Sequence, residues 1–262
     1  ISLKIQLVDF PKLKKTQNLC IYSFQITKIG TYYDTGFIKM FLKIKNKKID
    51  ISNIEAIIFD MDGTLVESEH IWAYAKQKIA EDEGIKISTN ELEKFIGRGL
   101  NDFIDEIITP ENAEHRTRLN QKIQEKALEN YKCNINVIDG AIDLLKAFKS
   151  AGMRMAICSS GPMEAIKSSL SALNATEMIE VIISGETLNI GKPDPLPYLQ
   201  TLLKLNLKPS SVIVFEDTIS GLKSATSAGI KTIIVGNQAK TQKFKNATFI
   251  EPYLRNFNVT KN

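Results

Sequence analysis

One stretch of the sequence constrains the fold more than any other, the apolar run 56–59 that ends in Asp60-Met61-Asp62-Gly63. A strand that is apolar on both faces belongs in a buried parallel sheet. Side chains repeat every two residues along a strand, so a strand continuing through Asp60 and Asp62 would point both carboxylates the same way. Asp62-Gly63 is also a turn signal, which predicts that the strand stops there with both acids at its carboxyl end.

Acids in this position suggest a metal site. In open parallel sheets, ligands bind just beyond the carboxyl ends of the strands. Two carboxylates placed there attract a cation, and hard oxygen ligands suit Mg²⁺. A surface turn that simply closes a strand has the same short pattern, so the motif is weak evidence by itself.

Three later stretches add polar groups at the ends of predicted strands or in adjoining loops. The run 155–158 is apolar and ends in Ser159 and Ser160. Lys192 stands in a short loop stiffened by Pro193 and Pro195. A second buried strand, 211–215, ends in two acids, Glu216 and Asp217.

A carboxylate, a hydroxyl, a lysine and a second acid pair, in this order, resemble the four motifs of the haloacid dehalogenase (HAD) superfamily. The resemblance covers about residues 55–250. Its motifs at 59–66, 191–195 and 215–221 match the phosphatase branch that carries a helical cap after the first strand. Each motif is weak alone, but four in order at workable spacing are strong evidence.

The resemblance implies a catalytic role for each motif. Asp60 would be the nucleophile that forms an acyl phosphate, and Asp62 would protonate the leaving alcohol and later take a proton from water. Mg²⁺ would be held by the Asp60 side chain, the Asp62 main-chain carbonyl and Asp217. Glu216 would bind the ion through water or help to position Asp217.

The remaining candidates would contact the substrate. Ser159 would donate a hydrogen bond to a phosphate oxygen, and Lys192 would place its charge between the phosphate and Asp60. Thr64 and Ser160 would add hydroxyl contacts. Taken alone, Ser159 would be an ordinary serine at the end of a strand, and Lys192 an ordinary solvated lysine of a loop.

Cap residues should choose the substrate by closing over the site. Trp72, early in the first cap helix, and Arg98, in the loop Gly97-Arg98-Gly99, are the candidates for substrate contact. The sugar phosphomutase branch carries a histidine and a basic residue where this chain has Trp72 and Leu100, unless the loop shifts to bring in Arg98. A tryptophan at position 72 is more like the residue found in the sugar-phosphate phosphatases of the group. Trp72 also suits the apolar core of the cap.

The predicted fold is α/β, a Rossmann-like parallel sheet with an inserted four-helix cap. Helical patterns fill 67–135, with the fourth helix opened by Thr109-Pro110-Glu111, and helices alternate with short apolar strands from Asp139 onward. The expected core therefore comprises 55–66 and 136–255, the cap 67–135, and a tail 256–262.

Residues 1–54 do not resemble the family. They carry a net charge of +7 against −3 for the rest of the chain. The favoured interpretation is a solvated extension that is poorly ordered or not native to the protein, although 37–44 alternates loosely as an amphipathic strand would. Its lysines alternatively suit an anionic partner or an organellar targeting segment.

Composition narrows the remaining function classes. Three cysteines without metal spacing indicate reduced thiols, and we expect a cytoplasmic monomer. No apolar run is long enough for a membrane span, and the core lacks the basic stripe of a nucleic-acid binder.

The sequence thus predicts a Mg²⁺-dependent phosphatase for small phosphorylated metabolites, most suitably sugar or polyol phosphates. The presence of Asp62 sets dehalogenation aside, because a halide leaving group needs no proton. A phosphomutase of the same fold is the first alternative, and a catalytically silent binding or regulatory module is the second.

Overall fold

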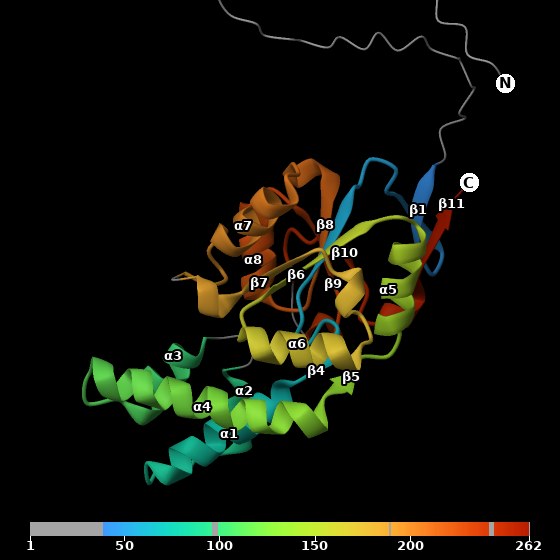
Figure 1. The fold of residues 1–262 in the computed structure, drawn as a ribbon. Coiled ribbons are helices and arrows are strands. Elements are labelled where there is room, and N and C mark those ends of the chain that lie inside the picture. The colour runs from blue at the N-terminus through green and yellow to red at the C-terminus, as the bar shows by residue number, and fades with distance from the viewer. Residues whose placement is uncertain (1–38, 96–98, 189, 241–243, 262) are drawn as a thin grey trace, which may run out of the picture. The chain divides into compact units, whose positions relative to one another are not determined.

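The structure is a computed structural model that describes residues 39–95, 99–188, 190–240 and 244–261 (Figure 1). Residues 56–250 are built around a six-stranded sheet with the strand order β10-β9-β8-β3-β6-β7. All neighbouring strands of this sheet run parallel, as the sequence predicts. The strands are β3 (Ala56–Phe59), β6 (Arg154–Ser159), β7 (Val181–Ser184), β8 (Val212–Glu216), β9 (Lys231–Ile234) and β10 (Phe249–Ile250).

Helices cover both faces of the central sheet. These are α5 (Ala141–Ser150), α6 (Met163–Ala172), α7 (Leu196–Leu205) and α8 (Ile219–Ser227). Alternate residues of β3 enter different cores, as the two-residue period of a strand requires. Phe59 packs with the apolar residues of α5 and α6, whereas Ile58 packs with those of α7 and α8. The α/β fold expected from the sequence is therefore confirmed.

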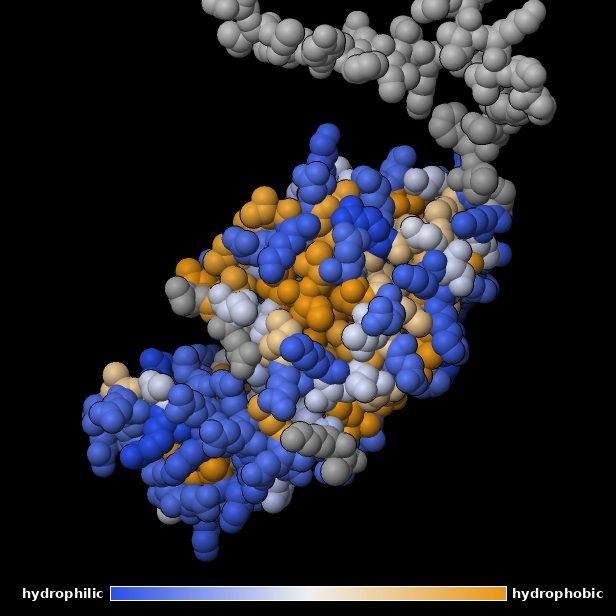
Figure 2. Space-filling model, in the orientation of Figure 1, coloured by the Kyte–Doolittle hydropathy of each residue, from blue (hydrophilic) through white to orange (hydrophobic). Residues whose placement is uncertain are grey.

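A group of helices, which we call the cap, follows the first core strand. It comprises α1 (Glu69–Asp82), α2 (Thr89–Glu93), α3 (Leu100–Phe103), a π-helix (Ile104–Ile108) and α4 (Ala113–Asn134). The cap has an apolar core of its own, and its outer surface is largely hydrophilic (Figure 2). The chain enters and leaves it through two short antiparallel strands, β4 (Val66–Glu67) and β5 (Asn136–Val137).

The start of α4 differs from the sequence prediction. Thr109 does not cap this helix, because its backbone is left-handed, with φ 52°, and it ends the π-helix instead. Asn112 is the cap, and its side chain accepts a hydrogen bond from the N–H of His115. An asparagine three residues further on gives the same chemistry, so the helix itself forms as expected.

The described part of the predicted extension, residues 39–54, is not a solvated segment. It forms the hairpin β1 (Met40–Ile44) and β2 (Lys47–Asp50), and β1 also pairs antiparallel with β11 (Phe257–Lys261). The predicted tail is thus a strand as well. Leu42 and Ile44 are buried in the core that contains Phe59, while the lysine between them is exposed. The hairpin expected at 34–36 lies outside the described residues.

The reason for this correction is a pairing between the two ends of the chain. The lysines of 39–48 make the segment look solvated, but on β1 the exposed Lys43 lies between the buried Leu42 and Ile44, so this strand has an apolar face. That apolar face needs a partner, and the partner is more than two hundred residues away in the sequence. In the part of the chain that the structure describes, no helix has the length and apolar character needed to cross a bilayer.

Candidate active site

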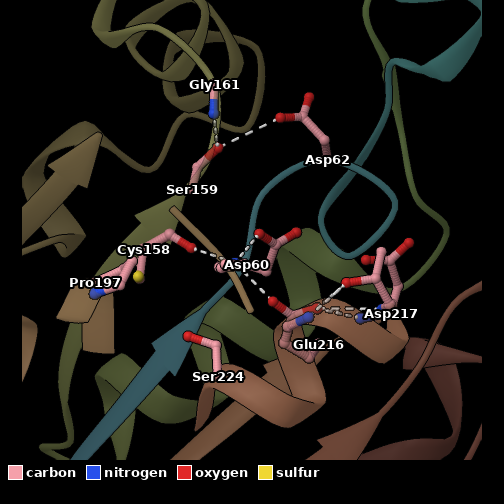
Figure 3. A network of polar contacts seen from close by, with 12 residues as sticks. Asp60, Asp62, Cys158, Ser159, Gly161, Pro197, Glu216, Asp217 and Ser224 are labelled. Atoms are coloured by element: carbon pink, nitrogen blue, oxygen red, sulfur yellow. Dashed lines mark hydrogen bonds and ion pairs between the residues drawn. The ribbon is translucent and has the colours of Figure 1, made fainter. Parts of the chain in front are cut away.

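Segments far apart in the sequence meet at the carboxyl edge of the central sheet. β3 lies between β6 and β8, with Phe59 in register with Ile157 and Phe215. The residues that follow these three, Asp60, Cys158 and Glu216, therefore reach the same edge. Figure 3 shows Asp60, Cys158 and Glu216 close together. Lys192 enters from the loop before α7.

Lys192 ties this edge together. Its Nζ lies 2.6 Å from Asp60 Oδ1 and 2.6 Å from Glu216 Oε1, and it donates to the carbonyl of Cys158 at 2.9 Å. The side chain is only 5% exposed. Burial alone would lower the pKa of this ammonium, but the charges of Asp60 and Glu216 outweigh burial and raise it well above its usual value. Lys192 is therefore a fixed positive charge.

Asp60 is buried beside that charge. Burial raises its pKa to about 8, with a further contribution from the carboxylates of Glu216 and Asp62, although Lys192 opposes the shift. Burial together with the neighbouring carboxylates raises the pKa of Asp217 as well. In the absence of a further cation, burial and the neighbouring carboxylates together outweigh the effect of the single lysine on the pKa of Asp60.

The carboxylate of Glu216 already accepts hydrogen bonds at both of its oxygens. One oxygen accepts from Lys192 and from the hydroxyl of Tyr198 at 2.9 Å. The other accepts from the main-chain N–H groups of Asp217 and Thr218, and from the Thr218 hydroxyl. Gly221 packs so close that a Cβ there would lie 1.8 Å from Glu216 Oε1. These contacts suit a residue that orients Lys192 and Asp217 better than one that binds an ion directly.

Asp217, in contrast to Glu216, has a carboxylate oxygen that accepts no hydrogen bond from the described residues. Its Oδ1 is buried and has no hydrogen-bond partner among the described residues. Gly63, with φ +83°, lies against the same carboxyl group, and a Cβ there would be 2.1 Å from Oδ2. A buried carboxylate oxygen without a donor is costly unless something positive occupies the space beside it.

These observations fit a divalent metal. Carboxylate oxygens of Asp60, Glu216 and Asp217 all lie within 4.8 Å of one another. The donor set consists of hard oxygen ligands, it carries excess negative charge, and it includes the unpartnered Asp217 Oδ1. Mg²⁺ suits such a set.

Asp62 lies apart from the other acids, toward Ser159 (Figure 3). Its Oδ1 accepts hydrogen bonds from the hydroxyls of Ser68 and of Tyr131, the latter at 2.6 Å. Its Oδ2 accepts a long hydrogen bond, 3.4 Å, from Ser159. β3 ends at Phe59, so Asp62 belongs to the turn and not to a continuing strand. The strand therefore stops before both acids, one residue ahead of Asp60, and both acids line the same cavity.

Tyr131 is a residue that sequence reasoning missed. It lies on α4 of the cap, is 1% exposed, and donates to Asp62 in the turn after β3. The indole N–H of Trp72 donates to the same tyrosine hydroxyl at 2.9 Å, with the two rings packed edge to face. Tyr131 recurs in the apolar pattern of α4, which predicts burial but gives no sign of the polar partner.

A cavity of about 410 Å³ opens between the sheet edge and the cap. Asp60, Asp62, Lys192 and Asp217 line it from the core, together with Ser160, and Trp72 lines it from the cap. Two predicted contact residues do not line it. Thr64 is fully buried, with its hydroxyl unpartnered among the described residues, and Ser159 is 3% exposed and accepts from the N–H of Gly161. Arg98 lies outside the described residues.

Comparison with known proteins agrees with this geometry. The model of the family described as haloacid dehalogenase-like hydrolase matches residues 57–235, more than half of the chain. Validoxylamine A 7'-phosphate phosphatase of Streptomyces hygroscopicus subsp. limoneus is 30% identical over 66% of this chain and 81% of its own length. Phosphorylated carbohydrates phosphatase of Thermotoga maritima is 29% identical over 69% of this chain and 84% of its own length.

A solved structure shows the same fold. The crystal structure of beta-phosphoglucomutase from Clostridium difficile matches with a TM-score of 0.68 at 24% identity, over 77% of this chain and 92% of that one. The family match covers both acid pairs and Lys192. The chain therefore belongs to the haloacid dehalogenase-like hydrolase family.

Proposed function

We propose that this protein is a Mg²⁺-dependent phosphatase that hydrolyses small phosphate monoesters, with sugar or polyol phosphates as the substrate class. The observation that carries the proposal is the contact of Lys192 with Asp60, beside the unpartnered oxygen of Asp217 and within one cavity. Hydrolysis of a phosphate ester needs charge stabilisation and positioning above all, and this edge of the sheet offers both.

In the first step, an oxygen of Asp60 attacks phosphorus and the bond from phosphorus to the alcohol oxygen breaks. Asp62 gives a proton to the departing alcohol, so the alcohol leaves neutral. In the second step, Asp62 takes a proton from water, and the water oxygen attacks the phosphoryl group. The bond from phosphorus to Asp60 then breaks, which releases inorganic phosphate and restores the carboxylate.

The metal would be held by the side chains of Asp60 and Asp217 and by the main-chain carbonyl of Asp62. When bound, Mg²⁺ supplies positive charge that lets an anionic carboxylate approach an anionic phosphate. Glu216 keeps Lys192 and Asp217 in place through the hydrogen bonds that saturate its carboxylate. Lys192 adds a second positive charge at the phosphate.

The three hydroxyl residues predicted to contact the phosphate, Ser159, Ser160 and Thr64, have different roles in this mechanism. Ser160 lines the cavity and is exposed, so it is available to a phosphate oxygen. Ser159 holds Asp62 at its Oδ2 and can turn its hydroxyl toward a bound phosphate. Thr64 is fully buried and supports the turn after β3 instead of contacting substrate. The monomeric state and the cytoplasmic location stay predictions.

Phosphate release over a panel of sugar, polyol and aryl phosphates, with and without Mg²⁺, tests the proposal. We expect Mg²⁺-dependent release from several of these esters, and Asp60→Asn should reduce kcat at least about a thousandfold without unfolding the protein. Asp143→Asn, an exposed aspartate on α5, is the matched control and should keep full activity. Interconversion of sugar phosphates without phosphate release would indicate a mutase, and full activity of Asp60→Asn would refute the assigned nucleophile.

A further inference from the structure

We propose that three side-chain amides of the cap, Asn101, Asn120 and Gln124, form a hydroxyl-recognition wall that selects polyhydroxylated substrates over substrates with a second anionic group. This inference rests on the proposed phosphatase function and specifies its substrate class. All three amides line the cavity that also contains Asp60 and Lys192. They come from two cap helices, since Asn101 lies on α3 and the other two lie on α4.

The amides are joined in a row by hydrogen bonds. The amide nitrogen of Gln124 donates to Asn120 Oδ1, and the amide nitrogen of Asn120 donates to Asn101 Oδ1 at 2.9 Å. Asn120 and Gln124 stand four residues apart, so they lie on the same face of α4. Each amide holds the next in a defined orientation, which lowers the entropic cost of presenting them to a ligand.

The row keeps most of its hydrogen-bonding capacity for a ligand. A side-chain amide has two N–H donors and a carbonyl oxygen with two lone pairs. The two bonds within the row occupy one N–H of Gln124 and one of Asn120. Unused donors and acceptors therefore stand side by side along one wall. A hydroxyl group both donates and accepts, so a row of this kind matches a chain of neighbouring hydroxyls.

The charges around the wall are nearly balanced. Among the described residues that line the cavity, the cap contributes one cation, Lys76, and one anion, Glu69. Lys76 Nζ donates to the carbonyl of Phe95 at 3.3 Å and lies 5.7 Å from the centre of the Phe103 ring. Burial raises the pKa of Glu69, and the charge of Lys76 acts in the opposite direction, so the two opposite charges attract each other.

Among the described residues of the cap, which do not include Arg98, this charge balance favours one class of phosphate ester over another. A short ester with a carboxylate at its far end needs a surplus of positive charge in the cap, because a buried anion without a counter-ion is costly. The amide wall offers dipoles instead of surplus charge. Trp72 adds an aromatic surface to the same cavity, and such a surface suits the apolar C–H face of a sugar or polyol.

The test compares three substrates on the full chain with Mg²⁺: a hexitol 6-phosphate, 2-phosphoglycolate and para-nitrophenyl phosphate. We expect the hexitol phosphate to have a kcat/KM at least about tenfold above that of 2-phosphoglycolate. In Asn120→Leu and in Gln124→Met, kcat/KM for the hexitol phosphate should fall about tenfold, as expected for hydrogen bonds lost with the hydroxyls. The aryl phosphate has no hydroxyls, so its kcat/KM should stay within about twofold.

The aryl phosphate also reports folding, because a variant that fails to fold loses this activity too. Gln121→Leu is the matched control, since Gln121 neighbours Asn120 on α4 but does not line the active-site cavity. A preference for 2-phosphoglycolate, or unchanged hexitol phosphate kinetics in both folded variants, would overturn the amide wall and leave the phosphatase proposal intact. Absence of turnover with all three substrates would overturn the phosphatase proposal itself.

Discussion

The two walls of the cavity are built on opposite principles. On the core side, Asp60, Glu216 and Asp217 are buried acids, and Lys192 contacts Asp60 and Glu216 at 2.6 Å. On the cap side, Asn101, Asn120 and Gln124 are neutral, and they are only partly buried or exposed. Burial raises the pKa values of Asp60 and Asp217 in the core wall, so their charged forms are unfavourable there unless a cation is bound. The neutral amides of the cap wall carry no such cost. The comparison suggests that chemistry is set at the sheet edge and selection in the cap.

Removing the charge of Lys192 should have the largest effect, and it tests whether the core wall carries the chemistry. Lys192→Met leaves Asp60 and Glu216 buried without their counter-ion, so we expect kcat to fall by roughly 10²–10³-fold for every substrate. The free energy of unfolding without Mg²⁺ should fall by about 3–5 kcal/mol. Lys204→Met, on the exposed side of α7, is the control and should change neither quantity. A loss confined to one substrate would show that Lys192 acts in selection.

The raised pKa values of the buried acids also predict how stability depends on pH. The pKa of Asp60 is raised from 3.8 to about 8 in the folded protein, so the folded state holds a proton that the unfolded chain has lost. The free energy of unfolding of the metal-free protein should therefore decrease as the pH rises from about 5 to about 8, by up to about 1.4 kcal/mol per unit. The raised pKa of Asp217 acts in the same direction.

Mg²⁺ should change this pH dependence of stability, because a bound cation favours the ionised carboxylates. Urea unfolding at several pH values, with and without saturating Mg²⁺, measures the effect. The ion should stabilise the protein most at high pH and flatten the dependence, by about 2.7 kcal/mol when its concentration is a hundred times its Kd. A metal-free protein that becomes more stable as the pH rises would contradict the arrangement of charges at the sheet edge.

The hydrogen bond from Tyr131 of the cap to Asp62 of the core predicts a smaller effect on activity and stability. Tyr131→Phe removes the cap hydroxyl that donates to Asp62 and the acceptor used by Trp72. Because the tyrosine acts through Asp62, we expect kcat to fall about tenfold with little change in KM, and stability to fall by about 1 kcal/mol. Tyr74→Phe, at an exposed position of the same cap, is the control. A raised KM with unchanged kcat would place Tyr131 on the selection side.

Much of the core was predictable because its signals are local. The apolar runs of β3, β6 and β8 end at the polar residues that the resemblance assigns to the site, and adjacent parallel strands bring those ends to one edge. Lys192 follows in the same way, because its loop precedes a helix packed on that sheet. The alternation of strands and helices therefore comes from patterns that a single sequence contains, whereas the strand order was not predicted from the sequence.

The parts that failed depend on partners distant in sequence. Leu42 and Ile44 gain their burial from pairing with β11, which no pattern in 39–54 reveals. In the sequence, Tyr131 looks like a helix-core residue, and only the structure shows that its hydroxyl donates to Asp62 of the core. The amide row depends on α3 and α4 packing at one particular offset, so Asn101, Asn120 and Gln124 look like ordinary surface amides in the sequence.

One measurement addresses most directly the claim that Asp60 carries the phosphoryl group at a charged sheet edge. The enzyme is mixed with Mg²⁺ and a reactive substrate, quenched in acid during turnover, digested and analysed by mass spectrometry. The peptide that contains Asp60 should gain the mass of one phosphoryl group in the wild type and in Gln121→Leu, and should lack it in Asp60→Asn. Turnover with the phosphoryl group on another residue, or unchanged turnover in Asp60→Asn, would contradict the account.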